Sequence, residues 1–583
     1  MKTTWNLDLL YTSGKDPQIE KDLLGYEKLC ATFEKKYKKD VSYLDNPESL
    51  LKALKDYEKF YEDATASKAY AYFNYRKDLN STDQEAEAES NKISQRLAKS
   101  SNKTLFFEIE LGKISKDRQK AILTNPEFSK YKYFLERIFI TAKYNLTEAE
   151  EKIMNLKSLP ARGMWVDSQE KLLNQQSVTY KGQQIALPGA QNMLTELPTK
   201  ERRMLADKVN EVLKSISHFA EAELNAILTD KKINDELRGL ANPYSATIIG
   251  YQNDEKAIIN FVQTVTQYFS ISHRFYKVKA KLLKEEKLEY ADRAAKVGTL
   301  KLKLSFEESL EILRKAFGKV NPEYVTILNR YVEQGQIDVF PRVGKRGGAY
   351  CSSNVGLPTF VMLNHVDNLK SLKTFAHEMG HAIHAEYSKT QPALYQGHTI
   401  SVAEVASTLF ENFVFEEVFE TLTAKEKIIA LHDTINDSIS TIFRQIGGFN
   451  FELDLHTTLR EKGALSKEEI AELHNKNMKA YLGPQFEMKE NDGYFFVNWP
   501  HIRYFFYVYS YAYGELISRA LYENYKKDPA YIKKIEEFLK AGGSKSPEKI
   551  FKDIGIDTSK PQFFIDGLKS IEEDIKKLEE LTA

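Results

Sequence analysis

The sequence predicts a mainly α-helical protein with a small β-sheet close to one central helix. Over most of the 583-residue chain, apolar residues recur at the spacing of an α-helix. Strand-like patterns are confined to a short stretch around a glycine turn and to about residues 338–364. The chain contains only 16 prolines, as expected where long helices are seldom interrupted.

The elements predicted before the central helix rest on the spacing of apolar residues and on turn residues. A long charged stretch at residues 57–113 has an apolar stripe that is interrupted near residues 80–82. Residues 178–187 alternate around a glycine and predict a β-hairpin. We place a soft domain boundary near residues 185–195. It divides the chain into an N-terminal helical region, residues 1–190, and a second region, residues 191–583.

The central helix is predicted over residues 369–385 and carries the most informative motif of the chain. Asp367 or Asn368 supplies its N-cap. The motif is HExxH, formed by His377, Glu378 and His381. Positions i and i+4 of a helix lie on one face, so the two imidazoles can bind one zinc ion while the glutamate faces a water activated by the metal. This pattern indicates metal-assisted hydrolysis of a peptide bond.

A catalytic zinc usually has three protein ligands, and the local sequence leaves the third open. The glycine and histidine that a metzincin requires are replaced by His384 and Tyr387. His384 lies about 10.5 Å along the helix axis from His377, too far for both to bind one ion. Glu404 opens the next apolar helix and could reach the metal from there. Ser401 and Glu404 also match a capping box, which is an equally good interpretation of this glutamate.

Three stretches together resemble the oligoendopeptidase F branch of the thimet-oligopeptidase-like zinc metallopeptidases. They are residues 345–351 followed by the HExxH motif and Glu404, residues 442–452, and the tyrosine-rich residues 500–511. The similarity is specific from about residue 340 to 515 and weaker elsewhere. It implies a large helical two-lobed peptidase with a deep substrate channel. It also implies that Glu404 is the third ligand of a single Zn²⁺ ion.

The resemblance also assigns roles to individual residues. Glu378 would be the general base, and His501 with a tyrosine would stabilise the oxyanion, Tyr504, Tyr507 and Tyr511 being the candidates. For any single tyrosine, packing in a buried aromatic helix is the stronger interpretation. Glu411 lies two turns after Glu404 and could accept a hydrogen bond from a ligating histidine, or it could be a surface carboxylate.

A substrate-binding strand edge is expected just before the central helix. Gly347, Gly348, Ala349 and Tyr350 precede an apolar run, and small residues near a strand edge allow another backbone to approach. An extended peptide could add there as an extra strand; the alternative is a tight turn between two strands. The leading hypothesis is therefore a zinc endopeptidase that cleaves short oligopeptides. Two alternatives remain: a metallocarboxypeptidase or dipeptidyl carboxypeptidase in which Arg503 binds the terminal carboxylate, and a non-catalytic oligopeptide-binding protein.

Composition argues against several other classes of protein. Lys and Arg number 83 and so do Asp and Glu, so the sequence gives no electrostatic case for nucleic acid binding. No stretch approaches 18 uncharged apolar residues, so no membrane span is expected. Only Cys30 and Cys351 occur, and the N-terminus lacks the apolar run of a secretory signal. We therefore expect a cytoplasmic location.

Overall fold

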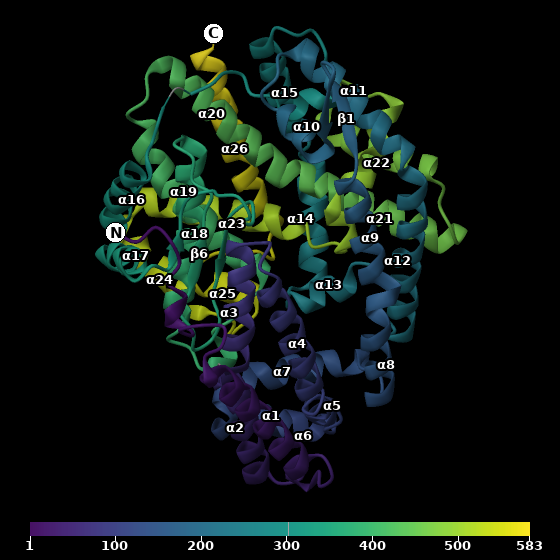
Figure 1. Ribbon diagram of the computed structural model, residues 1–583, viewed down its shortest axis with the longest axis vertical. Coiled ribbons are helices and arrows are strands. Elements are labelled where there is room, and N and C mark those ends of the chain that lie inside the picture. Colours follow the sequence, from purple (N-terminus) through teal and green to yellow (C-terminus); the bar gives the residue numbers. More distant parts are fainter. Residues whose placement is uncertain (64, 301, 583) are drawn as a thin grey trace. The chain divides into compact units, whose positions relative to one another are not determined.

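The computed structural model describes residues 1–63, 65–300 and 302–582, and Figure 1 shows their helices and strands. By their internal contacts these residues fall into two compact units. Unit 1 comprises Met1–Glu148, Leu302–Val418 and Leu521–Ile554; unit 2 comprises Ala149–Lys301, Phe419–Ala520 and Gly555–Ala583. Each unit is described by itself below.

Unit 1 contains the three-stranded sheet and the helices around it. Its helices are α1 (Pro17–Tyr37), α2 (Pro47–Glu62), α3 (Thr65–Leu79), α4 (Gln84–Ser101), α5 (Phe106–Gly112), α6 (Lys116–Thr124), α7 (Lys132–Thr141), α16 (Phe306–Val320), α17 (Pro322–Gln334), α18 (Leu369–Ser388), α19 (Ile400–Phe419), α24 (Ile532–Ala541) and α25 (Pro547–Asp553). Its strands are β4 (Ile337–Asp338), β5 (Tyr350–Ser352) and β6 (Phe360–Met362).

Unit 2 is almost entirely helical. Its helices are α8 (Glu148–Ser158), α9 (Met164–Asn174), α10 (Leu187–Met193), α11 (Thr199–Ser215), α12 (Ser217–Leu237), α13 (Ser245–Gly250), α14 (Glu255–Gln267), α15 (Ser270–Leu283), α20 (Ala424–Ser438), α21 (Gln445–Lys462), α22 (Lys467–Leu482), α23 (Tyr509–Lys527) and α26 (Pro561–Leu581). Its strands are β1 (Ser177–Tyr180), β2 (Gln183–Ala186), β3 (Leu288–Glu289) and β7 (Phe486–Glu487). Three helices cross the division between the units. Helix α8 begins in unit 1, α23 ends in unit 1, and the last residue of α19 belongs to unit 2.

Short 3-10 and π-helical elements join many of these helices. The 3-10 helices are η1 (Leu7–Leu9), η2 (Ser42–Leu44), η3 (Pro126–Tyr131), η4 (Ala142–Tyr144), η6 (Tyr290–Ala294), η7 (Ala393–Tyr395), η9 (Glu490–Asn498), η10 (Pro500–Arg503) and η11 (Pro529–Tyr531). Two π-helical turns are η5 (Leu159–Gly163) and η8 (Ile439–Arg444).

The prediction of a mainly α-helical fold with a small sheet near the central helix is confirmed. The predicted hairpin is β1 and β2, whose turn residues Lys181 and Gly182 have φ values of 49° and 78°. The predicted interruption at residues 80–82 separates α3 from α4. Strands after residue 190 were expected only at 338–364, which is wrong for β3 and β7. These two-residue strands pair in parallel although about 200 residues separate them, so no local pattern announces them.

The central helix α18 forms where its cap and apolar period predict it. The side chain of Asn368 accepts a hydrogen bond from the Ser371 N–H, and the chain stays helical through Ser388. Nearly every predicted apolar position of this helix is completely buried. Each such side chain contributes about 1.5–3 kcal/mol of hydrophobic stabilisation, so burial on several sides holds the helix rigidly inside unit 1.

The sheet of unit 1 has the strand order β4-β6-β5, with β5 at an edge. Strands β4 and β6 are parallel, and β5 is antiparallel to β6. The N-terminal segment is tied to the opposite side of this sheet. The Val339 N–H donates to the Thr3 carbonyl, and the Trp5 ring packs at 5.6 Å from the Phe360 ring. The other edge of the sheet is β5, which contacts α18.

Within the described ranges, no helix combines the length and the apolar content that crossing a membrane requires.

Candidate active site

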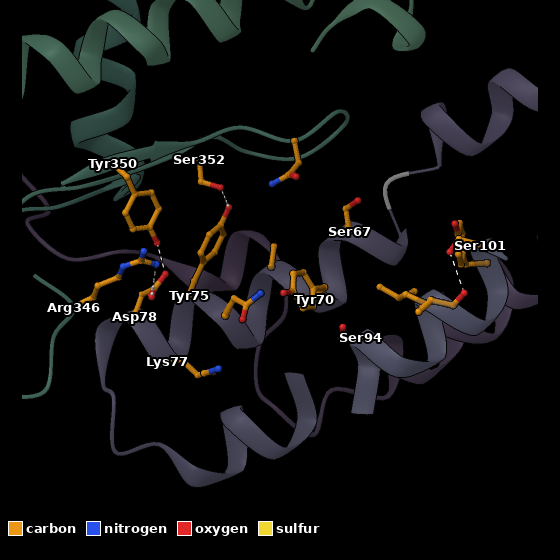
Figure 2. Close-up of a pocket in the computed structure, with 16 residues that line it drawn as sticks. Ser67, Tyr70, Tyr75, Lys77, Asp78, Ser94, Ser101, Arg346, Tyr350 and Ser352 are labelled. Carbon is orange, nitrogen blue, oxygen red and sulfur yellow. Dashed lines mark hydrogen bonds and ion pairs between the residues drawn. The ribbon is translucent and has the colours of Figure 1, made fainter. Parts of the chain in front are cut away.

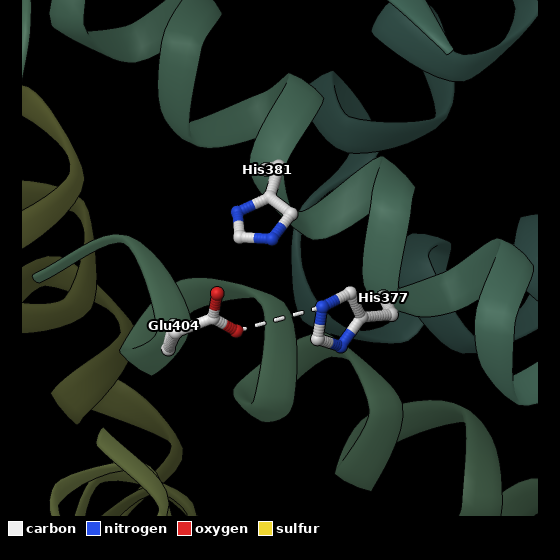
Figure 3. Close-up of side chains that lie close together, drawn as sticks. All are labelled: His377, His381 and Glu404. Atoms are coloured by element: carbon white, nitrogen blue, oxygen red, sulfur yellow. Dashed lines mark ion pairs between the residues drawn. The ribbon is translucent and has the colours of Figure 1, made fainter. Parts of the chain in front are cut away.

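Three predicted ligands converge in unit 1. His377 and His381 lie one turn apart on α18, with ring centroids 4.9 Å apart, and α19 brings Glu404 to the same place (Figure 3). One nitrogen from each histidine and one carboxylate oxygen lie within 4.8 Å of one another. Two imidazoles and a carboxylate are a donor set that zinc accepts. The residues therefore fit a single metal ion.

A glycine allows α18 and α19 to approach this closely. A Cβ atom on Gly380 would lie 2.8 Å from Ser407 Cα and 3.1 Å from Phe410 Cβ. Such contacts are too short for any side chain at this position. Helix α19 begins at Ile400, so Ser401 lies inside the helix and not at its N-cap. The capping-box interpretation of Glu404 is therefore wrong, and its carboxylate is available to the metal.

Glu411 orients His377. Its Oε1 lies 2.6 Å from His377 Nδ1, while His377 Nε2 lies 3.6 Å from Glu404 Oε2. A proton on Nδ1 leaves the Nε2 lone pair directed at the predicted metal position. Burial lowers the pKa of His377, but the hydrogen bond and negative charge of Glu411 outweigh burial and raise it to about 9. A proton therefore competes with a metal ion for this nitrogen.

Glu378 has the properties of a base that works near neutral pH. Its residue is 6% exposed, and burial raises its pKa to about 7. The charges of Glu404 and Glu411 act in the same direction as burial, while His377 and the backbone N–H of Cys351 oppose it. A carboxylate with a pKa near the working pH can take up and release a proton in one catalytic cycle.

A cavity of about 340 Å³ opens beside these residues. It is lined by the metal-site residues together with Ala349, Tyr350, Cys351, Ser353, His398 and Ala403. Edge strand β5 and its flanking residues thus form one wall of the metal pocket. The predicted substrate-binding residues Ala349 and Tyr350 lie there, whereas Gly347 and Gly348 do not line it.

The backbone of Cys351 faces the open edge of the sheet. Cys351 pairs in register with Val361 of β6. The Val361 N–H donates to the Gln336 carbonyl at 2.8 Å, on the side of β4. Since both backbone groups of a strand residue point to the same side, Val361 cannot bond to Cys351. The Cys351 N–H and C=O therefore point away from β6, in agreement with the lowering effect of this N–H on the pKa of Glu378.

The loop that leads into β5 is held in place from two directions. Asn364 Nδ2 donates to the carbonyls of Arg346 and Gly348 at 2.9 and 2.7 Å. The Arg346 N–H donates to the Asp78 carbonyl at the end of α3. Gly348 has a φ of 78°, a conformation that glycine adopts without strain. The glycines thus allow the turn that sets the strand edge beside the metal pocket.

The other predicted catalytic residues belong to unit 2. His501 lies in η10, and its Nδ1 forms a short hydrogen bond with the Tyr507 hydroxyl. The ring of Tyr511 lies 5.9 Å from the His501 ring. Tyr504 is 55% exposed and stacks against the Arg162 guanidinium. Histidine and tyrosines therefore form one cluster within unit 2.

The placement of Arg503 argues against its predicted role as a carboxylate anchor. Its residue is 3% exposed, and its guanidinium forms a bidentate ion pair with Glu223 at 2.7 and 2.6 Å. Its remaining donors are bonded to the backbone carbonyls of Phe496, Val497 and Trp499. Binding a substrate carboxylate would require breaking a buried ion pair, which is strongly destabilising.

Comparison with known proteins identifies the family. The family model described as peptidase family M3 matches residues 196–570, and one described as oligopeptidase F matches residues 110–169. The chain belongs to peptidase family M3. It is therefore a metallopeptidase, and its predicted resemblance to the oligoendopeptidase F branch is confirmed.

Relatives of this M3 peptidase match it over nearly its whole length. It is 26% identical to oligopeptidase PepF of Bacillus subtilis, across 99% of this chain and 87% of that protein. It is 27% identical to an oligoendopeptidase F homolog of Borreliella burgdorferi, across 98% of each chain. The fold is similar to that of a solved putative peptidase of Chlamydophila abortus, with a TM-score of 0.84, 24% identity and coverage of 99% and 98% of the two chains.

The sequence did not single out every residue that lines the metal pocket of this M3 peptidase. His398 lines the pocket and stacks on His384 at a centroid distance of 3.9 Å. Its Nδ1 is buried without a hydrogen-bond partner in the described part of the chain. Cys351 and Ser353 also line the pocket. A histidine six residues before Glu404 was a visible signal, but it matches no ligand spacing of an HExxH peptidase.

Proposed function

We propose that the protein is a zinc endopeptidase that cleaves internal bonds of short oligopeptides, with His377, His381 and Glu404 as metal ligands. The observation that carries the proposal is the convergence of these three donor atoms within 4.8 Å beside the buried Glu378. When bound, zinc supplies Lewis acidity, which polarises a peptide carbonyl and acidifies a water. Relatives named oligopeptidase and oligoendopeptidase support the choice of substrate class.

The proposed roles of the chain's own residues follow from their environments. Glu378 takes the proton of the attacking water and passes it to the departing amine, for which a pKa of about 7 is well suited. Glu411 keeps His377 in the tautomer that presents Nε2 to the metal. His501 and one of Tyr504, Tyr507 and Tyr511 donate hydrogen bonds to the oxyanion, a role that rests on the family resemblance.

The substrate is proposed to bind as an added strand along β5. The outward-facing C=O of Cys351, on one wall of the metal pocket, is positioned to accept a hydrogen bond from an extended peptide, while its N–H is turned towards Glu378. Backbone recognition of this kind depends little on side chains and therefore suits a peptidase that accepts many sequences. The ends of the peptide need not be recognised, which favours an endopeptidase over an exopeptidase.

The cytoplasm is the proposed location. Cys30 and Cys351 are both free thiols, and Cys30 is buried, which agrees with a compartment in which disulfides do not form.

The test is the cleavage of end-blocked peptides of graded length by zinc-loaded protein, followed by mass spectrometry. Internal cuts are expected, with efficiency falling as the peptides grow longer. Glu378→Gln should lower kcat by about 10²- to 10⁴-fold while retaining one zinc per chain. Trimming only of peptides with free ends would instead favour an exopeptidase. Tight binding without turnover by zinc-loaded wild-type protein would favour a binding protein.

A further inference from the structure

Two cavities meet at strand β5, and its residues alternate between them. Ala349, Cys351 and Ser353 line the metal pocket. Ser352 and Asn354, with the earlier Arg346, line a second cavity of about 800 Å³, and Tyr350 lines both. This is the period of two that a strand imposes, because successive side chains point to opposite faces. The second cavity therefore lies on the face of the strand that the metal pocket leaves unused.

A peptide added to β5 would place alternate side chains in this second cavity. Directly opposite residues on paired strands have their side chains on the same face. Peptide residues opposite Tyr350 or Ser352 would therefore point towards the second cavity. This step rests on the strand addition proposed above, in which backbone bonds supply affinity and pockets for alternate side chains supply specificity.

The far wall of the cavity is built from helices α3 and α4. Figure 2 shows Tyr75, Lys77 and Asp78 of α3 with Ser94 of α4 on this side, and Tyr350 and Ser352 on the other. Hydroxyl and amide groups predominate among the lining residues. The Tyr75 hydroxyl donates to Ser352 Oγ at 2.7 Å. The wall is thus polar and attached to the strand.

The charges at the cavity leave one cation without a partner. Asp78 supplies the single carboxylate of the lining residues, and it already accepts a hydrogen bond from the Tyr350 hydroxyl at 2.5 Å. The same carboxylate lies 3.3 Å from the Arg346 guanidinium. Lys77 is partly buried, and its ammonium forms no ion pair or hydrogen bond with any residue that the structure describes. The lining residues therefore include two cations, Lys77 and Arg346, and one anion, Asp78, which gives the cavity lining a positive excess.

We propose that this cavity binds a carboxylate of the peptide substrate through Lys77, with Arg346 as a second cation. Because side chains along β5 alternate between the two cavities, the carboxylate would belong to a glutamate or aspartate on the face of the strand opposite the metal pocket. A C-terminal carboxylate has the same chemistry, and the experiment below separates the two sources. The site would give a peptidase with otherwise broad backbone recognition a preference for acidic residues at fixed distances from the cleaved bond.

The test is a glutamate scan of a neutral, end-blocked peptide. A glutamate replaces each residue in turn, with the matching glutamine peptide as reference, and kcat/KM is measured with zinc-loaded protein. We expect glutamate to be preferred about fivefold at one position, or at two positions two residues apart, as for a single partly exposed ion pair. The preference should weaken with added salt because the pair is reached by solvent.

Two variants decide whether the cavity is responsible. Lys77→Gln should abolish the preference for glutamate and leave cleavage of the neutral peptide unchanged. Lys99→Gln, on an exposed position of α4 outside the cavity, should keep the preference. Equal cleavage of glutamate and glutamine peptides by the wild type, or a preference that survives in Lys77→Gln, would overturn the proposal.

A binding measurement separates this proposal from the proposed activity. The same peptides, carrying a fluorophore, are titrated onto zinc-loaded Glu378→Gln protein with or without Lys77→Gln. Tighter binding of the glutamate peptide that requires Lys77 supports the cavity even if no peptide is cleaved. A preference only for a free C-terminus over its amide, again requiring Lys77, would support the site with the chain end as its source. Affinities that do not respond to Lys77→Gln would refute it.

Discussion

At the scale of single residues, Glu411 decides which nitrogen of His377 faces the metal. Removing its charge in Glu411→Gln should weaken zinc binding by about 10- to 100-fold, because the imidazole becomes less basic and less firmly oriented. Activity at saturating zinc should change much less, since the three ligands remain. Competition with a chelator of known affinity measures the change in Kd.

The matched control for Glu411 is Glu416→Gln on the same helix. Glu416 is exposed and pairs with Lys526 at 3.2 Å, away from the metal ligands. Its zinc affinity should equal that of the wild type. An unchanged affinity in Glu411→Gln would contradict the orienting role of the bond to His377.

Glu452 predicts a pH dependence of stability in unit 2. It is 1% exposed, and burial raises its pKa from an ordinary 4.5 to about 8, although it accepts the Phe506 N–H at 2.6 Å. Between these pH values the folded chain holds a proton that the unfolded chain has released. Stability therefore falls as the pH rises from 4.5 to 8, by at most about 1.4 kcal/mol per pH unit from this group.

Glu452→Gln isolates this contribution. Glutamine keeps an acceptor for the Phe506 N–H but cannot titrate. The free energy of unfolding of the variant, relative to wild type, should rise between pH 5.5 and 8. Urea titrations across this range measure the difference, and a difference independent of pH would show that Glu452 does not carry the proton.

Residue patterns predicted the reactive groups but not their neighbours. The i, i+4 spacing of His377 and His381 fixes their common face on any helix. Glu404 needed the family resemblance, because its local pattern with Ser401 fitted a cap equally well. His398 and Cys351 reach the pocket through packing between segments far apart in sequence, which no spacing rule describes. For Arg503 the sequence showed a cation but not the buried Glu223 that engages it.

At the scale of elements, the contact between α18 and α19 holds the metal ligands together. Gly380→Ala should destabilise the protein by about 1–3 kcal/mol, because the added methyl group clashes with the backbone of α19. It should also weaken zinc binding, since the two histidines would move away from Glu404. Thermal unfolding and zinc titration measure the two effects.

Gly25→Ala, in the middle of α1, is the control for the intrinsic effect of alanine. No atom lies within 4 Å of the position that its Cβ would occupy. The substitution should therefore stabilise the helix by about 0.5–1 kcal/mol and leave zinc affinity unchanged. Equal behaviour of the two variants would contradict a tight helix contact at Gly380.

Elements were predictable where local signals agree. The N-cap at Asn368 and the helical spacing of the apolar residues predicted α18, and the glycine turn predicted the hairpin of β1 and β2. The two-residue strands β3 and β7 are defined only by their pairing with each other. Their sequences carry no alternation long enough to recognise, since the partner determines the strand.

At the scale of the whole molecule, the chain crosses between the two units several times. Unit 1 is assembled from three separate stretches, and the metal ligands come from the middle one. Local patterns report helices and caps but not which distant segments share a core. The predicted division near residue 190 therefore stays a proposal; it falls between the two matched family regions, 110–169 and 196–570.

Because all three ligands lie in unit 1, zinc should stabilise that unit selectively. A ligand at 100 times its Kd adds about 2.7 kcal/mol to the stability of the state that binds it. Removing zinc with a chelator should therefore speed hydrogen exchange in α18 and α19, while α12 and α21 of unit 2 exchange as before. In His377→Ala, hydrogen exchange in α18 and α19 should be fast with or without zinc. An equal acceleration in both units would mean that they open as one cooperative body, and the prediction would be wrong.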